Sequence, residues 1–200
     1  VRALQHTLSL APYAAAYRIA LLPDFQHVTE QAENALLKTL EEPPDKVVLL
    51  LTVNALENLL PTIVSRCEVI RMRPAPLADT SVYLQSVHRL ATEKADLIAH
   101  LSGGRIGPAI QMAEKPELIA QRVEQLEMFL NLLPAMRYER FSLAQKITKT
   151  YDDSRQNALA AVILWLSFWR DVFVRATGAE IPLVNVDLEA QVDRAAGLLD

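Results

Sequence analysis

The chain has 200 residues, enough for one large domain or two to three small ones, and its hydrophobic fraction of 51% is ample for packed cores. Twenty Lys and Arg residues against 24 Asp and Glu residues give a formal charge of −4, too little to steer the whole surface toward an acidic polymer. The composition therefore excludes a disordered chain, and any contact with nucleic acid must be local or shared with other subunits.

Cysteine, histidine and hydropathy exclude further classes of protein. The single cysteine, Cys67, excludes an internal disulfide, and the four histidines lack the paired spacing of a zinc site, so we predict no metal site and a place in the reducing cytoplasm. The apolar stretch Ala158–Trp169 is shorter than the roughly 20 residues that span a bilayer, which favours a buried helix and no membrane contact. The chain opens at Val1 without methionine, and we expect that it is cut from a longer parent.

Residues 1–76 mix the periods of helices and strands. The expected order is a short helix around Leu4, a strand, a helix and two more strands, the last four at about 17–22, 29–42, 46–53 and 67–72. The three predicted strands are apolar runs without alternation, which is typical of a parallel sheet covered on both faces. Thr29 is the expected N-cap of the helix over 29–42, and Pro43-Pro44 is expected to end it.

Beyond residue 76 every predicted element is a helix. The expected helices lie at about 77–88, 93–101, 105–113, 116–132, 135–150, 153–176 and 186–199. The fold class is therefore α/β followed by all-α, and a break at 114–117 divides the helical part. The helix over 153–176 is apolar nearly all round, so we expect a large core or a subunit interface to cover it, with Leu166 in the core.

The segment after the first predicted strand, residues 23–26, contains only one carboxylate, Asp24. A nucleotide hydrolase needs a carboxylate there to hold Mg²⁺, but Pro23 follows the strand directly and Asp24 stands one residue later. The alternative is that Asp24 simply opens a turn. The chain also contains no G-x-x-x-x-G-K-[ST] phosphate loop, and we interpret "SGGRIGPA" (102–109) as a helix N-terminal cap and tight turn. These residues cannot build a nucleotide site by themselves.

Three motifs, in order, resemble one family. "TEQAENALLKTLEEPP" (29–44), "KVVLLLTVN" (46–54) and "PTIVSRC" (61–67) resemble AAA+ clamp-loader subunits of bacterial DNA polymerase III. The resemblance implies that 1–76 is the distal part of an AAA+ parallel-sheet core. It also implies a helical lid bundle at 77–115 and a helical collar bundle for oligomerisation at 116–200.

The same resemblance implies roles for single residues. Arg66 would be an arginine finger that acts in trans, because a guanidinium offers permanent charge and a planar fork of donors to phosphate oxygens. Without the resemblance, Arg66 reads as a surface ion-pair partner. Asn54 would be a sensor of the γ-phosphate, or else a polar residue in a strand-end turn. Cys67 is expected to pack as a small apolar residue at the start of the third strand, and not to act as a catalytic thiol.

Two departures from the family pattern indicate its non-hydrolysing type. Active members carry Asp-Glu-Ala-Asp where this chain has Pro-Asp-Phe-Gln (23–26), and their lid arginine falls on Gly107 here. The sequence is thus most similar to the delta-prime type, which implies no ATP or magnesium bound by this chain but both in a neighbouring subunit. The implied partners are other clamp-loader subunits through the collar, the sliding clamp, and primed DNA only through the assembly.

Two alternatives stay open. The complete protein would be an active ATPase of the gamma/tau type if a phosphate loop precedes Val1 and Asp24 replaces the usual magnesium ligand. Under the second alternative, the helical part belongs to a non-replicative oligomerising protein that carries a degenerate AAA+ remnant.

Overall fold

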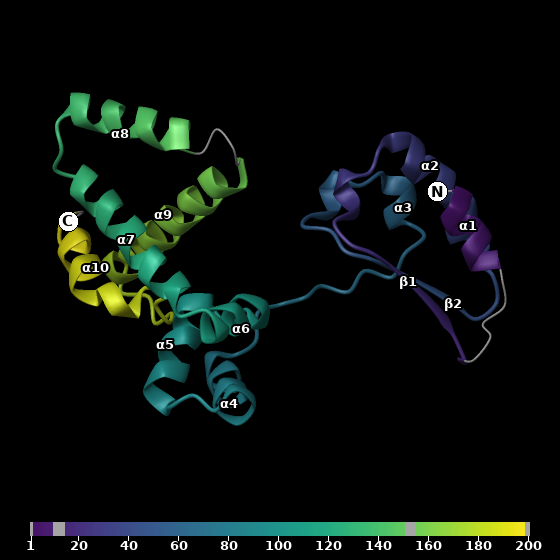
Figure 1. Cartoon of the computed structure of the whole chain (residues 1–200), viewed down its shortest axis with the longest axis horizontal. Helices are drawn as coiled ribbons and strands as arrows, with labels where there is room; N and C mark the ends of the chain where they lie inside the picture. The colour runs from purple at the N-terminus through teal and green to yellow at the C-terminus, as the bar shows by residue number, and fades with distance from the viewer. Residues whose placement is uncertain (1, 10–14, 151–154, 199–200) are drawn as a thin grey trace. The chain divides into compact units, whose positions relative to one another are not determined.

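The computed structural model describes residues 2–9, 15–150 and 155–198 and divides the chain into two compact units (Figure 1). Unit 1 comprises residues 1–72, and unit 2 comprises residues 73–200. The three-part division at residues 76 and 115 stays a prediction. The elements of unit 1 are α1 (Arg2–Ser9), β1 (Arg18–Leu22), η1 (Phe25–His27), α2 (Glu30–Glu41), β2 (Val47–Leu51), η2 (Leu56–Asn58) and α3 (Pro61–Val64).

Strands β1 and β2 form a parallel pair, as the apolar runs predict. The register pairs Arg18 with Val47 and Leu22 with Leu51, so the two strands end at the same edge. A parallel connection requires a crossover, and α2 supplies it between the strands.

Helix α2 has the ends that its sequence predicts. The Thr29 hydroxyl accepts the Ala32 N–H at 3.3 Å and so caps the first turn of the helix, where the Thr29 carbonyl accepts the same N–H at 2.8 Å. At the other end Glu42 has φ −130° and ψ 72°, outside the helical region, because Pro43 follows it.

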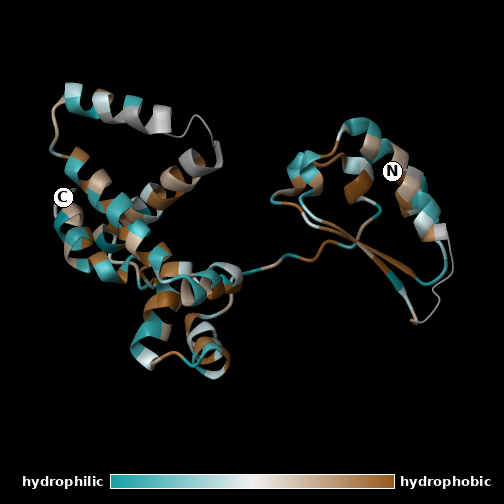
Figure 2. Ribbon diagram, in the orientation of Figure 1, coloured by the Kyte–Doolittle hydropathy of each residue, from teal (hydrophilic) through white to brown (hydrophobic). Residues whose placement is uncertain are grey.

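The prediction of a sheet covered on both faces is wrong for this chain. Exposure alternates along both strands, and Ile19 and Leu21 keep 63% and 60% of their area exposed. In Figure 2 most of the ribbon of β1 and β2 is coloured as hydrophobic. The covered face packs on the cluster of Phe25, Leu36 and Ile63. A continuous apolar run therefore marks two apolar faces, although the described residues cover only one.

The prediction of a third strand is also wrong. Residues 67–72 carry no strand assignment, and Ile70 and Met72 are 73% and 90% exposed. A strand exists only where a neighbour completes its hydrogen bonds, and in the described part of the chain β1 and β2 pair only with each other.

Every described element of unit 2 is a helix, as predicted. Its elements are α4 (Leu77–His88), α5 (Thr92–Ser102), α6 (Ile106–Glu114), α7 (Glu117–Leu132), α8 (Arg137–Thr150), α9 (Arg155–Ala176), η3 (Val186–Leu188) and α10 (Glu189–Ala196). Two apolar clusters join most of these helices. Leu84, Ala95, Ile98 and Ala109 join α4, α5 and α6. The other cluster joins α7, α9, η3 and α10 around Phe129, Phe168, Val172 and Val192.

Helix α9 is covered on one face only, so the prediction that Leu166 lies in the core is wrong. Phe168 and Val172 are fully buried, whereas Leu166 and Phe173 are 61% and 66% exposed. Helical spacing places Leu166 and Phe173 on one side, and a helix that is apolar all round does not tell which side its neighbours cover. None of the helices in the described ranges has the length and hydropathy to cross a bilayer.

The glycine pair in "SGGRIGPA" ends a helix and does not cap the start of one. Gly103 and Gly104 have φ of +59° and +74°, and Gly103 is the C-cap of α5. A Cβ atom at Gly104 would stand 2.1 Å from the Ala75 carbonyl oxygen. Glycine is needed here for its left-handed backbone and for this close approach. The tight turn is confirmed, but its place at a helix N-terminus is wrong.

Candidate functional site

Asp24 and Asn54 lie beyond the ends of the two parallel strands. Both residues are exposed, and Thr52 links the two strand ends. The Thr52 N–H donates to the Leu22 carbonyl at 3.1 Å, and the Asp24 N–H donates to the Thr52 hydroxyl at 3.0 Å. The carboxyl edge of a parallel sheet is where nucleotide ligands bind in α/β proteins. The structure thus places both predicted residues at the edge expected for them.

Asp24 itself has the geometry of a turn residue. Its φ of 49° and ψ of 44° lie in the left-handed region, where it precedes the short helix η1. Aspartate tolerates this region better than most residues do. Its Oδ1 atom accepts a long contact of 3.5 Å from Gln26 Nε2. The turn interpretation therefore explains Asp24 without a metal ion.

Arg66 follows the short helix α3 and lies at the surface of unit 1. Its side chain is 33% exposed, and Nε donates to Glu41 Oε1 at 2.8 Å. Nη2 also donates to that carboxylate oxygen, and Nη1 donates to the Thr62 carbonyl at 2.9 Å. Ser65, the C-cap of α3, accepts from Nη1 at 3.3 Å. The guanidinium is therefore neither buried nor loose: several acceptors of its own chain hold it.

Two glutamates of α2 were missed as site residues by reasoning from the sequence. Glu41 pairs with Arg66, and the buried Glu33 accepts the Leu60 N–H at 3.1 Å, just before α3 begins. The only signal in the sequence is that both belong to the motif over 29–44 that carries the family resemblance. Neither contact follows from local spacing, since Glu41 and Arg66 are 25 residues apart.

Cys67 packs against the apolar cluster of unit 1, as predicted. Burial raises the pKa of its thiol above the ordinary value, because a thiolate is disfavoured where water is excluded. A higher pKa leaves less of the nucleophilic thiolate at neutral pH, which opposes a catalytic role.

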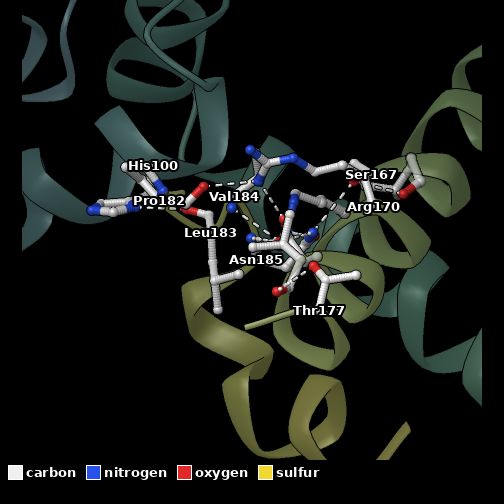
Figure 3. A network of polar contacts seen from close by, with 12 residues as sticks. His100, Ser167, Arg170, Thr177, Pro182, Leu183, Val184 and Asn185 are labelled. Carbon is white, nitrogen blue, oxygen red and sulfur yellow. Dashed lines mark hydrogen bonds and ion pairs between the residues drawn. The ribbon is translucent and has the colours of Figure 1, made fainter. Parts of the chain in front are cut away.

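A second polar cluster lies in unit 2, where Asp171 accepts several hydrogen bonds, and Figure 3 labels its partners Arg170, Val184 and Asn185. Its Oδ2 atom accepts from the backbone N–H groups of Val184 and Asn185 at 2.9 and 2.7 Å, and from Asn185 Nδ2 at 2.7 Å. Its Oδ1 atom accepts from Arg170 at 2.6 Å, and Asp171 is fully buried. A buried carboxylate with this many donors fixes the loop before η3 onto α9.

The same loop reaches α5 and α7. His100 Nδ1 lies 2.7 Å from the Leu183 carbonyl oxygen, so that nitrogen carries the proton. Arg122 of α7 donates to Asp187 at 2.6 Å and also to Asn185, and its side chain is only 7% exposed. The burial of these groups identifies the cluster as structural support within unit 2.

Comparison with known proteins agrees with the resemblance. Residues 1–76 match the family model described as "DNA polymerase III, delta subunit". Over 197 residues, 98% of this chain, the sequence is 22% identical to the DNA polymerase III subunit delta' of Bacillus subtilis. Over 113 residues, 55% of this chain, it is 34% identical to the delta' subunit of Yersinia pestis. A solved structure of a gamma subunit-related protein from Thermotoga maritima has a TM-score of 0.47, too low to define the fold.

The chain spans only part of these relatives. It covers 59% of the length of the Bacillus subtilis protein and 31% of the Yersinia pestis protein. The activity of the whole proteins therefore remains a proposal for this chain. The matches nevertheless confirm the predicted resemblance to clamp-loader subunits of the delta-prime type.

Proposed function

We propose that this clamp-loader protein of the delta-prime type does not hydrolyse ATP itself and presents Arg66 to ATP bound in a neighbouring subunit. The neighbour then supplies the nucleotide and Mg²⁺, and this chain supplies one positive charge to the transition state. The assembly would act in the cytoplasm and load a sliding clamp on primed DNA.

The position of Arg66 is the observation that carries this proposal. The guanidinium lies at the surface, 33% exposed, at the end of a short helix that α2 holds in place. A finger that acts in trans must be reachable from outside its own fold and must not need a large rearrangement. A buried arginine such as Arg122 does not meet the first condition.

The strand edge supports the loss of hydrolysis. Pro23 directly after β1 has no ligand atom, and the turn conformation of Asp24 serves the backbone. In addition, Gly107 stands within α6 where active members of the family carry an arginine. A phosphoryl-transfer site needs a magnesium ligand and positive charge near the phosphates, and these positions supply neither.

The exposed face of α9 supports an oligomerising role for the helical part. Leu159, Val162, Ile163, Leu166 and Phe173 recur at helical spacing, and each is at least 46% exposed. Contiguous apolar area on a surface marks contacts with other proteins. We assign this face, the α9 stripe, to contact with another clamp-loader subunit.

Substitution Arg66→Ala in the complete protein, assembled with its ATPase partners, tests the finger. We expect ATP hydrolysis by the assembly to fall about tenfold or more, because fingers contribute about 10³-fold to 10⁵-fold where they act alone. Arg71→Ala, which removes an exposed arginine of the same unit, is the control and should leave hydrolysis unchanged. Full activity of the Arg66→Ala assembly would exclude the finger role.

The gamma/tau alternative has one observation in its favour. A 68-residue part of the chain is 34% identical to the DNA polymerase III subunit tau of Bacillus subtilis. Under this alternative the complete protein hydrolyses ATP alone and loses that activity in the Asp24→Ala variant. Under our proposal the isolated protein shows no hydrolysis that depends on Asp24.

A further inference from the structure

We propose that Glu41 is the positioning residue of Arg66: its carboxylate holds one edge of the guanidinium so that the other edge faces an incoming phosphate. This inference rests on the proposed function of Arg66 and adds a second residue to that site. It assigns a role to a glutamate at the end of α2, in the "LEEPP" segment.

The atoms in contact define which edge Glu41 holds. Nε and Nη2 of Arg66 both donate to the single oxygen Oε1 of Glu41, the side-on arrangement of an arginine and a carboxylate. Nη2 carries a second N–H, which points away from Nε, and with Nη1 it forms the end-on edge of the fork. A phosphate oxygen can therefore accept this second N–H of Nη2 while Glu41 remains in place.

Two further acceptors fix the rotation of the guanidinium. Nη1 donates to the Thr62 carbonyl at 2.9 Å, and Ser65 accepts from the same nitrogen at 3.3 Å. The Ser65 hydroxyl in turn donates to the Thr62 carbonyl at 3.1 Å. The arginine is thus tied to α3 at one nitrogen and to α2 at the other two.

Helix α2 also fixes the start of the segment that carries Arg66. The buried Glu33 accepts the Leu60 N–H, so one helix holds this segment through two carboxylates, eight residues apart along α2. Helix α2 and α3 are in contact along this segment. Because both carboxylates belong to one helix, they hold the arginine in a fixed position relative to α2, as a positioning role requires.

Partial exposure explains why this pair is suited to catalysis more than to stability. Arg66 and Glu41 are 33% and 48% exposed, and an ion pair at such a surface adds little to the free energy of folding. An arginine that is already ordered, however, loses less rotamer freedom when it enters a neighbouring site. The pair's main effect should appear in the rate of hydrolysis and not in stability.

The test is Glu41→Gln in the complete protein, assembled with its ATPase partners, beside the control Glu42→Gln. Both changes remove one negative charge from the same helix end, but only Glu41 contacts Arg66. We expect Glu41→Gln to lower kcat for ATP about tenfold with KM unchanged, because the finger acts in the transition state. Glu42→Gln should change neither constant.

Combination with Arg66→Ala separates positioning from other effects. If Glu41 acts through the arginine, Glu41→Gln causes no further loss once Arg66→Ala is present. A further loss in that background would overturn the inference, as would an unchanged kcat in the single variant. A higher kcat in Glu41→Gln would also overturn it, because the carboxylate would then compete with the phosphate.

An NMR measurement on the complete protein without its partners distinguishes this inference from the proposed function. The Arg66 Nε–H signal should exchange slowly with water in the wild type and in Glu42→Gln, and fast in Glu41→Gln. Fast exchange in the wild type would refute the positioning contact, whatever the role of Arg66. Slow exchange together with full hydrolysis by Arg66→Ala would refute the finger instead.

Discussion

Two arginines, one in each unit, make ion pairs of opposite character. The Arg66 side chain in unit 1 is 33% exposed and pairs with a half-exposed Glu41, whereas Arg122 in unit 2 is 7% exposed and pairs with Asp187, which is 18% exposed. A charge enclosed by protein must keep its partner, because leaving it unpaired costs several kcal/mol. A charge at the surface can be shared with another molecule. Burial thus separates an arginine that supports the fold from one that we propose is presented to a partner.

Removal of the buried carboxylate should have the largest effect on stability. In Asp171→Ala the N–H groups of Val184 and Asn185 lose their acceptor, so we expect unit 2 to lose about 3–5 kcal/mol of unfolding free energy. Urea unfolding followed by tryptophan fluorescence measures this, because both tryptophans lie in α9.

The control for that change is Asp193→Ala. Asp193 pairs with Arg175 but is 54% exposed, so its loss should cost less than about 1 kcal/mol. Equal costs for the two aspartates would remove the distinction between buried and exposed charges in unit 2.

A buried carboxylate in unit 1 should have an intermediate effect. Glu33→Ala leaves the Leu60 N–H without its acceptor, which should destabilise the start of α3 by about 1–3 kcal/mol. Hydrogen exchange at the Leu60 amide should become correspondingly faster. The matched change Glu30→Ala, at an exposed position of the same helix, should leave that amide protected. If both variants expose it equally, Glu33 does not hold the segment that leads to Arg66.

The α9 stripe should show the smallest effect on the stability of the chain. Leu166 is 61% exposed, so Leu166→Asp should change the unfolding free energy by less than about 0.5 kcal/mol. Phe168→Ala, at a fully buried position two residues away, should cost about 3–5 kcal/mol.

The proposed assembly with clamp-loader subunits should, by contrast, be strongly impaired by Leu166→Asp. Size-exclusion chromatography of the mixed subunits should show that Leu166→Asp no longer joins the assembly, because a charge would enter an apolar interface. A Leu166→Asp protein that is stable and still assembles would mean that the α9 stripe is not the interface.

Local patterns predicted most of the secondary structure. Helix α2 lies over 30–41, within the expected 29–42, and Thr29 caps it as expected. The parallel strands also follow from the sequence, because apolar runs of that length are typical of them. These features depend on residues close together in the chain. The placements of Asp24 and Asn54 at one sheet edge follow in turn from the parallel order of the strands.

Local sequence patterns did not predict the contacts between residues that are far apart in the chain. The segment over 67–72 has the composition of a strand, but strand formation depends on a neighbour that composition does not reveal. Glu41 and Arg66 are 25 residues apart, and Arg122 and Asp187 are 65 apart. Only folding brings such pairs within hydrogen-bond distance.

By itself the sequence determined the helices, the parallel pair, the family resemblance and the identity of Arg66 as the candidate finger, because these depend on residue type and short spacing. The tertiary structure alone decided that one face of the sheet and one face of α9 stay exposed, and that Arg66 is held by Glu41 at the surface. The physical reason is that burial and ion pairing are properties of neighbours in space, and a linear pattern contains no information about which faces those neighbours cover.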